Sequence, residues 1–145
     1  ICMKIIGLKN IKRKVIGNNK GDILKFLSRR DSFFKKFGEI YFTEIFKNKA
    51  KGWNYHKKNN CLLSVPYGKV QFWFIDGRRN SKSYLREQKI INSRKNYKLI
   101  SVPPGVWFSF RSIVKLSIVA NCIENPHSDN ETLKSRKIKN HEITD

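Results

Sequence analysis

The sequence of 145 residues has little cysteine and no long apolar run. A helix needs about 20 consecutive apolar residues to cross a bilayer, so no membrane span is predicted. Residues 1–8 are interrupted by charge at Lys4 and predict no signal peptide. The three cysteines (Cys2, Cys61 and Cys122) are odd in number, widely spaced and form no Cys-x-x-Cys pair. They predict free thiols in a reducing, cytoplasmic compartment.

Acidic residues are also scarce. The chain has only 11 Asp and Glu residues but 31 Lys and Arg residues, which gives a formal net charge of +20. Such a balance indicates an anionic partner, either a nucleic acid, a phosphate-bearing ligand or an acidic lipid. An alternative is compositional drift, since the chain is rich in Lys, Asn and Ile together and its charges are spread through every segment. No helix-turn-helix, zinc-finger or RNA-recognition motif is present, so nucleic-acid binding is the weakest of these alternatives.

What the chain does contain is short β-type segments separated by turns. Hydrophobic residues make up 39% and aromatic residues 12%, enough for the core of one domain of this length. β-branched and aromatic residues gather between turn signals after Gly38. The strands expected there cover residues 39–46, 53–57, 61–65, 69–75, 83–91, 98–102, 106–110 and 116–120. Their spacing of about ten residues predicts an all-β barrel or jelly roll.

This pattern predicts one domain over residues 1–145, with the barrel core at about 38–124 and short extensions at both ends. A short strand at residues 5–8 and one or two helical turns beginning at Asp22 are expected in the N-terminal extension. A basic tail is expected at about 132–145, in which Ile138 could form a last short strand.

Two stretches carry the candidate functional residues. The first runs from Lys51 through His56 to a Pro66-Tyr67-Gly68 turn, and the second covers residues 100–110. In a strand, Asn54 and His56 share one face, while Trp53 and Tyr55 share the other. The two stretches are predicted to form strand pairs around a common cavity.

These segments resemble the dTDP-4-dehydrorhamnose 3,5-epimerase family of the cupin superfamily over residues 38–131. Residues 51–56, Lys-Gly-Trp-Asn-Tyr-His, stand where that family has Arg-Gly-Leu-His-Tyr-Gln. The family pattern Gly-x-Val followed by Asp-x-Arg-x-x-Ser is matched by Gly68, Val70, Asp76, Arg78 and Ser81. Residues 102–110, Val-Pro-Pro-Gly-Val-Trp-Phe-Ser-Phe, stand for Ile-Pro-x-Gly-x-x-His-Gly-Phe.

The resemblance implies a cupin-type jelly-roll β-barrel, a homodimer and a dTDP-linked 4-keto-6-deoxyhexose as ligand in surface polysaccharide synthesis, with no cofactor. Lys51 and Arg78 match basic positions that would face an anionic ligand, and Asn54 matches a ligand-facing position. Trp107, in the last motif, could stack on a sugar or base.

Four positions depart from the family. Asn54 replaces the catalytic His, Phe108 replaces the His of the last motif, and the acidic Tyr would fall at Ala120 or Asn121. A family Lys would fall at or near Cys61. Because an amide has no useful basicity, catalysis is predicted to be impaired or altered.

His56 is then the one neutral-pH base expected in the barrel. Its possible companions are Glu44, Tyr41, Tyr67 and Tyr97, and the alternative is a structural histidine. No metal is predicted, because one good ligand of the cupin set remains; His127 and Cys61 could contribute in principle.

Three functions therefore stand open. The first is a nucleotide-sugar epimerase relative with altered catalysis, and the second is a non-catalytic cupin that binds a sugar or nucleotide sugar. The third is a basic nucleic-acid-binding protein.

Overall fold

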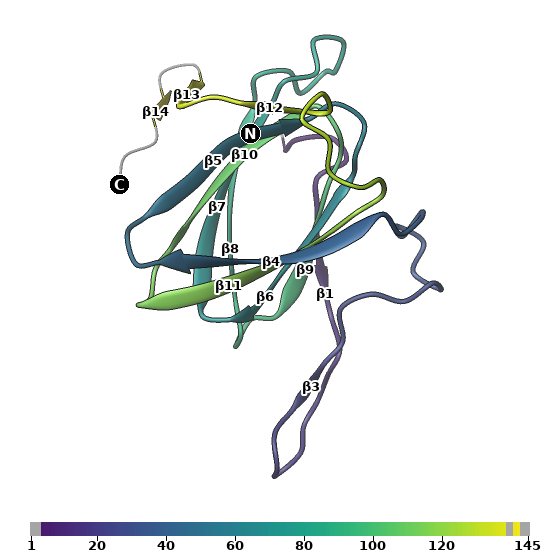
Figure 1. Ribbon diagram of the computed structural model, residues 1–145, viewed down its shortest axis with the longest axis vertical. Helices are drawn as coiled ribbons and strands as arrows, with labels where there is room; N and C mark the ends of the chain where they lie inside the picture. The colour runs from purple at the N-terminus through teal and green to yellow at the C-terminus, as the bar shows by residue number, and fades with distance from the viewer. Residues whose placement is uncertain (1–3, 139–140, 143–145) are drawn as a thin grey trace.

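Two antiparallel sheets face one another across an apolar interior (Figure 1). The computed structural model describes residues 4–138 and 141–142. One sheet has the order β1-β9-β6-β11-β4, and the other has the order β12-β5-β10-β7-β8. The first sheet contains β1 (Lys9–Lys12), β4 (Glu39–Phe46), β6 (Cys61–Tyr67), β9 (Lys98–Val102) and β11 (Leu116–Ile123). The second sheet contains β5 (Ala50–His56), β7 (Lys69–Asp76), β8 (Glu87–Ser93), β10 (Val106–Ser112) and β12 (Thr132–Lys134). This confirms the all-β jelly roll.

The alternation of side chains sets which face of each strand is inside. On β7, Val70, Phe72 and Phe74 are fully buried in the main core, whereas Gln71 and Trp73 face outward. Successive side chains of a strand point to opposite faces, so a strand with one apolar series can close one wall of the barrel. The turns predicted at Gly68 and Gly105 join β6 to β7 and β9 to β10.

Strand β6 is apolar on both faces because both are covered. Leu63 and Val65 face the main core, and Leu62 packs in a second cluster with Leu99 and Cys122. Residues of the N-terminal segment cover that second cluster: Ile11, Phe26, Leu27, Phe33 and Phe34.

The N-terminal segment differs from the prediction. The helical turn expected at Asp22 is wrong: β2 (Val15–Ile16) and β3 (Ile23–Leu24) form a hairpin that projects from the barrel (Figure 1). The Asp22 carboxylate accepts a hydrogen bond from the Asn18 backbone N–H, so it closes the hairpin turn rather than capping a helix. The strand expected at residues 5–8 lies instead at Lys9–Lys12.

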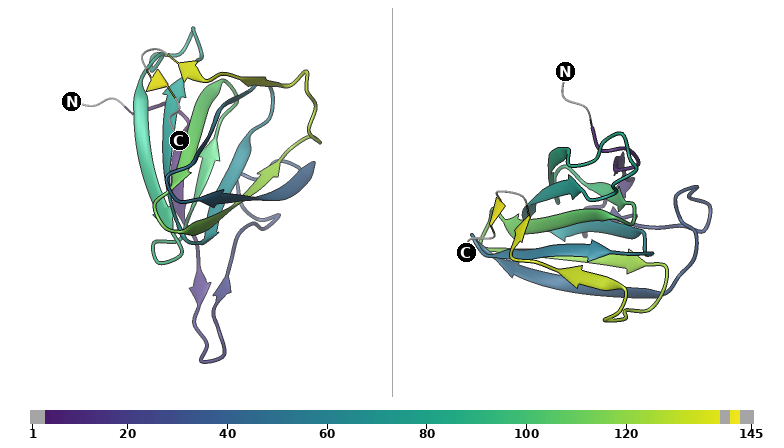
Figure 2. Two further views of the ribbon diagram at one scale, coloured as in Figure 1. Left: turned by 60° about the vertical axis from the view of Figure 1, so that its left-hand side comes forward. Right: turned by 90° about the horizontal axis from the view of Figure 1, so that it is seen from above.

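The C-terminal segment contributes to the barrel. β12 pairs with β5 and places Thr132 opposite His56, so the second sheet extends beyond the predicted core range. β13 (Lys137–Ile138) and β14 (His141–Glu142) form a small hairpin beyond it (Figure 2). The short strand predicted at Ile138 is confirmed. Among the described residues, no helix is long and apolar enough to cross a membrane.

Candidate functional site

The site begins with a bulge in β5. Phe108 of β10 lies opposite Asn54, but Phe110, two residues on, lies opposite Lys51, three residues away on β5. Gly52 occupies the irregular step with a φ of +114°, and an added Cβ would lie 2.7 Å from the Phe108 carbonyl oxygen. A bulge changes the face on which the following residues lie. Lys51 therefore lines the same cavity as Asn54 while remaining exposed, although strict alternation would place it on the other face with Trp53.

These residues line an interior cavity of about 180 Å³ between the two sheets. It adjoins a second, more open pocket of about 320 Å³, here called the mouth, and Tyr41, Asn54 and His56 line both spaces. The other lining residues of the inner cavity are Thr43, Lys51, Leu63, Phe108, Phe110, Val119 and Asn121. Asn54, His56 and Phe108, which the sequence predicted to share a cavity, are thus together in one.

His56 is held by Glu131, a residue that the sequence did not single out as its partner. His56 Nδ1 lies 2.9 Å from Glu131 Oε2, and His56 is only 6% exposed. The other carboxylate oxygen, Oε1, accepts hydrogen bonds from the backbone N–H of Lys58 and Asn59 at 2.6 and 2.8 Å. Burial raises the pKa of Glu131, but these two backbone donors and His56 outweigh it, so its pKa lies below the usual value.

The His56 ring lines the cavity and uses one of its two nitrogens in the contact with Glu131. The imidazole stacks on Phe108, with ring centroids 6.1 Å apart and planes 15° apart. Nδ1 is engaged by Glu131, and Nε2 has no hydrogen-bond partner among the described residues. A carboxylate that fixes one imidazole nitrogen orients the other toward a reacting group. An imidazole held in this way has the geometry that general-base chemistry requires.

Tyr41 is the one predicted companion of His56 that lines the same cavity. Glu44 and Tyr67 are exposed on the outside of the barrel, and Tyr97 is buried in another part of the core. Asn121, at one of the two positions expected for the family tyrosine, lies directly opposite Tyr41 in the β4–β11 pair. Asn121 Nδ2 donates a hydrogen bond of 2.9 Å to the Tyr41 hydroxyl.

Cys61 occupies the interior near Asn121 and is 1% exposed. Burial raises the pKa of its thiol far above the usual value, so it stays neutral. Cys61 cannot supply the positive charge of the family lysine. Within the described part of the chain, no group of three or more His, Cys, Asp or Glu side chains is arranged to hold a metal ion.

Arg78 and Trp107 lie outside this cavity. The Arg78 guanidinium contacts the Asp76 carboxylate, with Nε to Oδ1 at 2.8 Å, and also donates to the Ile6 carbonyl. Asp76 is fully buried; burial raises its pKa, but hydrogen bonds from Arg78 and Ser83 outweigh that effect and lower it. Asp76 therefore orients Arg78, which fastens the N-terminal segment to the barrel. The Trp107 ring packs against Tyr55, 4.9 Å away, on the outer face of the second sheet.

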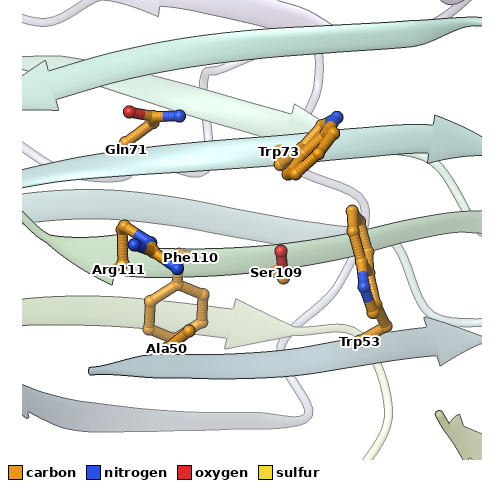
Figure 3. A pocket seen from close by; sticks show the side chains of 7 residues that line it. All are labelled: Ala50, Trp53, Gln71, Trp73, Ser109, Phe110 and Arg111. Atoms are coloured by element: carbon orange, nitrogen blue, oxygen red, sulfur yellow. The ribbon is translucent and has the colours of Figure 1, made fainter. Parts of the chain in front are cut away.

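A second pocket of about 280 Å³ lies on that outer face, over β5, β10 and β7 (Figure 3). Trp53 and Trp73 form an edge-on pair at one end, with Gln71 and Arg111 at the other. No carboxylate, histidine or thiol lines it among the described residues. Such a pocket offers contacts but no general base, so the interior cavity is the candidate site for chemistry.

Two facing antiparallel sheets around an interior cavity define a cupin-type jelly roll. The chain is similar to the structure of a dTDP sugar isomerase from Desulfovibrio desulfuricans, with a TM-score of 0.88 and 31% identity over 90% of this chain and 85% of that one. It also resembles a Legionella pneumophila dTDP-6-deoxy-D-glucose-3,5-epimerase in complex with dTDP-4-keto-L-rhamnose (TM-score 0.82, 20% identity, 92% of this chain and 75% of that one).

A third similar structure is the dTDP-4-dehydrorhamnose 3,5-epimerase of Sulfolobus tokodaii, with a TM-score of 0.81 and 22% identity over 88% of this chain and 76% of that one. Comparisons with protein-family models and with curated proteins gave no match. The chain belongs to the family of the Desulfovibrio desulfuricans dTDP sugar isomerase, and its likeness to the two 3,5-epimerases shows that they share its fold.

Proposed function

We propose that the interior cavity binds a dTDP-linked 4-keto-6-deoxyhexose and that His56 replaces the family histidine as general base. The proposal is supported mainly by the fact that Lys51, Asn54 and His56 line one cavity. The imidazole of His56 is already oriented there by its contact with Glu131. The base is displaced by two residues along β5. Because two residues is the period of a strand, the displaced base remains on the interior face.

The chemistry requires removal of a proton from a carbon next to a keto group. An imidazole has a suitable basicity near neutral pH, whereas the Asn54 amide has none. Glu131 would stabilise the imidazolium that forms after proton transfer, as a buried carboxylate does in other histidine pairs. Asn54 then acts by hydrogen bonding to the ligand instead of by proton transfer.

The two spaces fit two parts of such a ligand. Pockets for drug-sized ligands usually reach about 300 Å³ or more, so the inner cavity of about 180 Å³ would hold the sugar ring. The diphosphate and nucleoside would occupy the mouth of about 320 Å³, where Lys134 lies, while Lys51 lines the inner space. Arg78 and Trp107 lie on other surfaces and do not line either space. Contact of these two residues with a ligand stays a prediction.

The test is to incubate the protein with a dTDP-linked 4-keto-6-deoxyglucose in D₂O and to follow deuterium at the carbons beside the keto group by NMR. We expect exchange in the native protein and its loss in His56→Gln. Asn54→His restores the family base and should raise the exchange rate at least tenfold. Tight binding in calorimetry without exchange in any of the three proteins would refute His56 as base.

A second candidate function is binding of the nucleotide sugar without turnover. The replacement of two family histidines by Asn54 and Phe108 favours it. It predicts measurable affinity for the nucleotide sugar and no exchange. Absence of both binding and exchange would exclude both candidates and leave binding to nucleic acid, which predicts affinity that falls steeply with salt concentration.

We also propose a cytoplasmic homodimer that acts in polysaccharide biosynthesis. Edge strand β4 exposes Ile40, Phe42 and Phe46 by 45%, 68% and 64%, and an exposed apolar edge strand usually marks an interface. Phe42→Glu should shift the protein toward monomer in sedimentation, whereas Ile91→Glu, on the edge strand of the other sheet, should not. A monomeric native protein at high concentration would refute the dimer.

A further inference from the structure

Tyr41 and Asn121 form a polar pair inside the barrel. They are direct partners in the β4–β11 ladder, and both line the inner cavity with His56. Asn121 is 4% exposed, and its Oδ1 has no hydrogen-bond partner among the described residues. Buried polar atoms in native proteins are nearly always paired, and an unpaired one is costly. The Asn121 amide is therefore held inside the barrel by its Nδ2 hydrogen bond to Tyr41, while its Oδ1 is buried without a partner.

The hydrogen bond between Asn121 and Tyr41 leaves the phenolic O–H of Tyr41 as an unused donor. Asn121 Nδ2 donates to the Tyr41 hydroxyl oxygen, so the phenolic hydrogen is not used in that bond. No acceptor for this hydrogen is found in the described part of the chain. Burial raises the pKa of Tyr41, so the phenol remains protonated at neutral pH. The pair thus leaves the phenolic hydrogen of Tyr41 without a protein acceptor beside the cavity that Tyr41 lines.

We propose that the Tyr41 hydroxyl donates a hydrogen bond to the keto oxygen of the sugar and that Asn121, whose Nδ2 donates to the Tyr41 oxygen, positions that hydroxyl. This assignment rests on the proposed function. His56 Nε2 takes the proton from the carbon beside the ketone, and the electron pair of that C–H bond forms a carbon–carbon double bond. The carbonyl π pair moves to oxygen, and the Tyr41 hydroxyl stabilises the enolate oxygen. Return of the proton from His56 restores the ketone.

This places the electrophilic group on β4 rather than at the family tyrosine position on β11. The two strands are neighbours, and the Tyr41–Asn121 register places the hydroxyl beside the side chain at the family position. A preorganised hydrogen-bond donor to a developing oxyanion contributes about 100-fold or more to the rate. The same donor distinguishes a keto sugar from its 4-hydroxy analogue.

The experiment compares Tyr41→Phe with Tyr97→Phe, which removes the hydroxyl of a buried tyrosine elsewhere in the core. Two quantities are measured, the deuterium exchange rate of the 4-keto sugar and the affinities for dTDP, dTDP-4-keto-6-deoxyglucose and dTDP-glucose. We expect Tyr41→Phe to reduce exchange about 100-fold and to remove the preference for the keto sugar, with the affinity for dTDP unchanged. Tyr97→Phe should match the native protein.

The outcomes separate the two proposals. Native exchange that persists at full rate in Tyr41→Phe overturns the role of Tyr41 and leaves the proposed function intact. If the native protein binds but does not exchange, loss of the keto preference in Tyr41→Phe supports the contact, and an unchanged preference overturns it. If no dTDP compound binds the native protein, the proposed function fails, and the assignment of Tyr41 and Asn121 fails with it.

Discussion

The Glu131 carboxylate gives the sharpest prediction, because one side chain ties the C-terminal segment to the loop after β5 and to the candidate base. Glu131→Gln keeps the size of the side chain but removes its charge. The amide oxygen can still accept from the backbone of Lys58 and Asn59, whereas the bond to His56 loses its charged acceptor. The side chain is 12% exposed, so solvent screens little of this loss.

Hydrogen bonds to charged groups contribute about 1.5–3 kcal/mol each, and one is lost while two are weakened. We expect Glu131→Gln to lower the free energy of unfolding by about 2–3 kcal/mol at pH 7. For a domain of this length that corresponds to a fall in Tm of about 6–9 °C. Glu44→Gln, which changes an exposed carboxylate on β4, should stay within about 0.5 kcal/mol.

The effect should depend on pH with a defined sign. The pKa of Glu131 is lower in the folded protein than its ordinary value of 4.5. A lowered folded-state pKa stabilises the protein above the unfolded-state value, and that stabilisation is lost as the pH falls through the folded-state value. The gap between native protein and Glu131→Gln should therefore be full at pH 7 and shrink below about pH 4.5. Urea denaturation at pH 7, 5 and 4 measures it; a gap below about 0.5 kcal/mol at pH 7, or one that widens in acid, would refute the reasoning.

Two further predictions concern the β5 bulge and the Arg78 cluster. Gly52→Ala should lower the free energy of unfolding by about 2–4 kcal/mol, because the new Cβ would lie 2.7 Å from the Phe108 carbonyl oxygen at a position with positive φ. Gly21 also has positive φ but nothing lies within 4 Å of an added Cβ, so Gly21→Ala should lower it by about 1 kcal/mol in the same denaturation assay. Asp76→Asn should lower the free energy of unfolding by about 3 kcal/mol, because it leaves the Arg78 guanidinium without its carboxylate partner. Limited proteolysis should then cut the N-terminal segment faster, since Arg78 also donates to the Ile6 carbonyl. An unchanged cutting rate would contradict the role of Arg78 in fastening that segment.

Much of the barrel followed from the sequence. The alternation of Val70, Phe72 and Phe74 with polar or outward residues predicted β7, and the glycine turns predicted its connections. The interior positions of Asn54 and His56 followed from the period of a strand. The helix predicted at Asp22 is wrong because the Asp22 carboxylate accepts from the Asn18 backbone N–H and closes the β2–β3 hairpin, and an Asp before an apolar run suits a hairpin turn as well as a helix N-cap.

The candidate site likewise has parts that the sequence predicts and parts that only the tertiary structure reveals. The residue types at positions 54 and 56 are enough to predict a histidine on the interior face two residues from the family position, because strand periodicity is local. The partner of that base is not local: Glu131 lies 75 residues from His56 and reaches it only because β12 pairs with β5. Lys51 enters the cavity because of a bulge, which alternation alone cannot predict. Sequence therefore determined the fold class and the displaced histidine of Lys51–His56, whereas the pairing of distant strands decided which groups act with it.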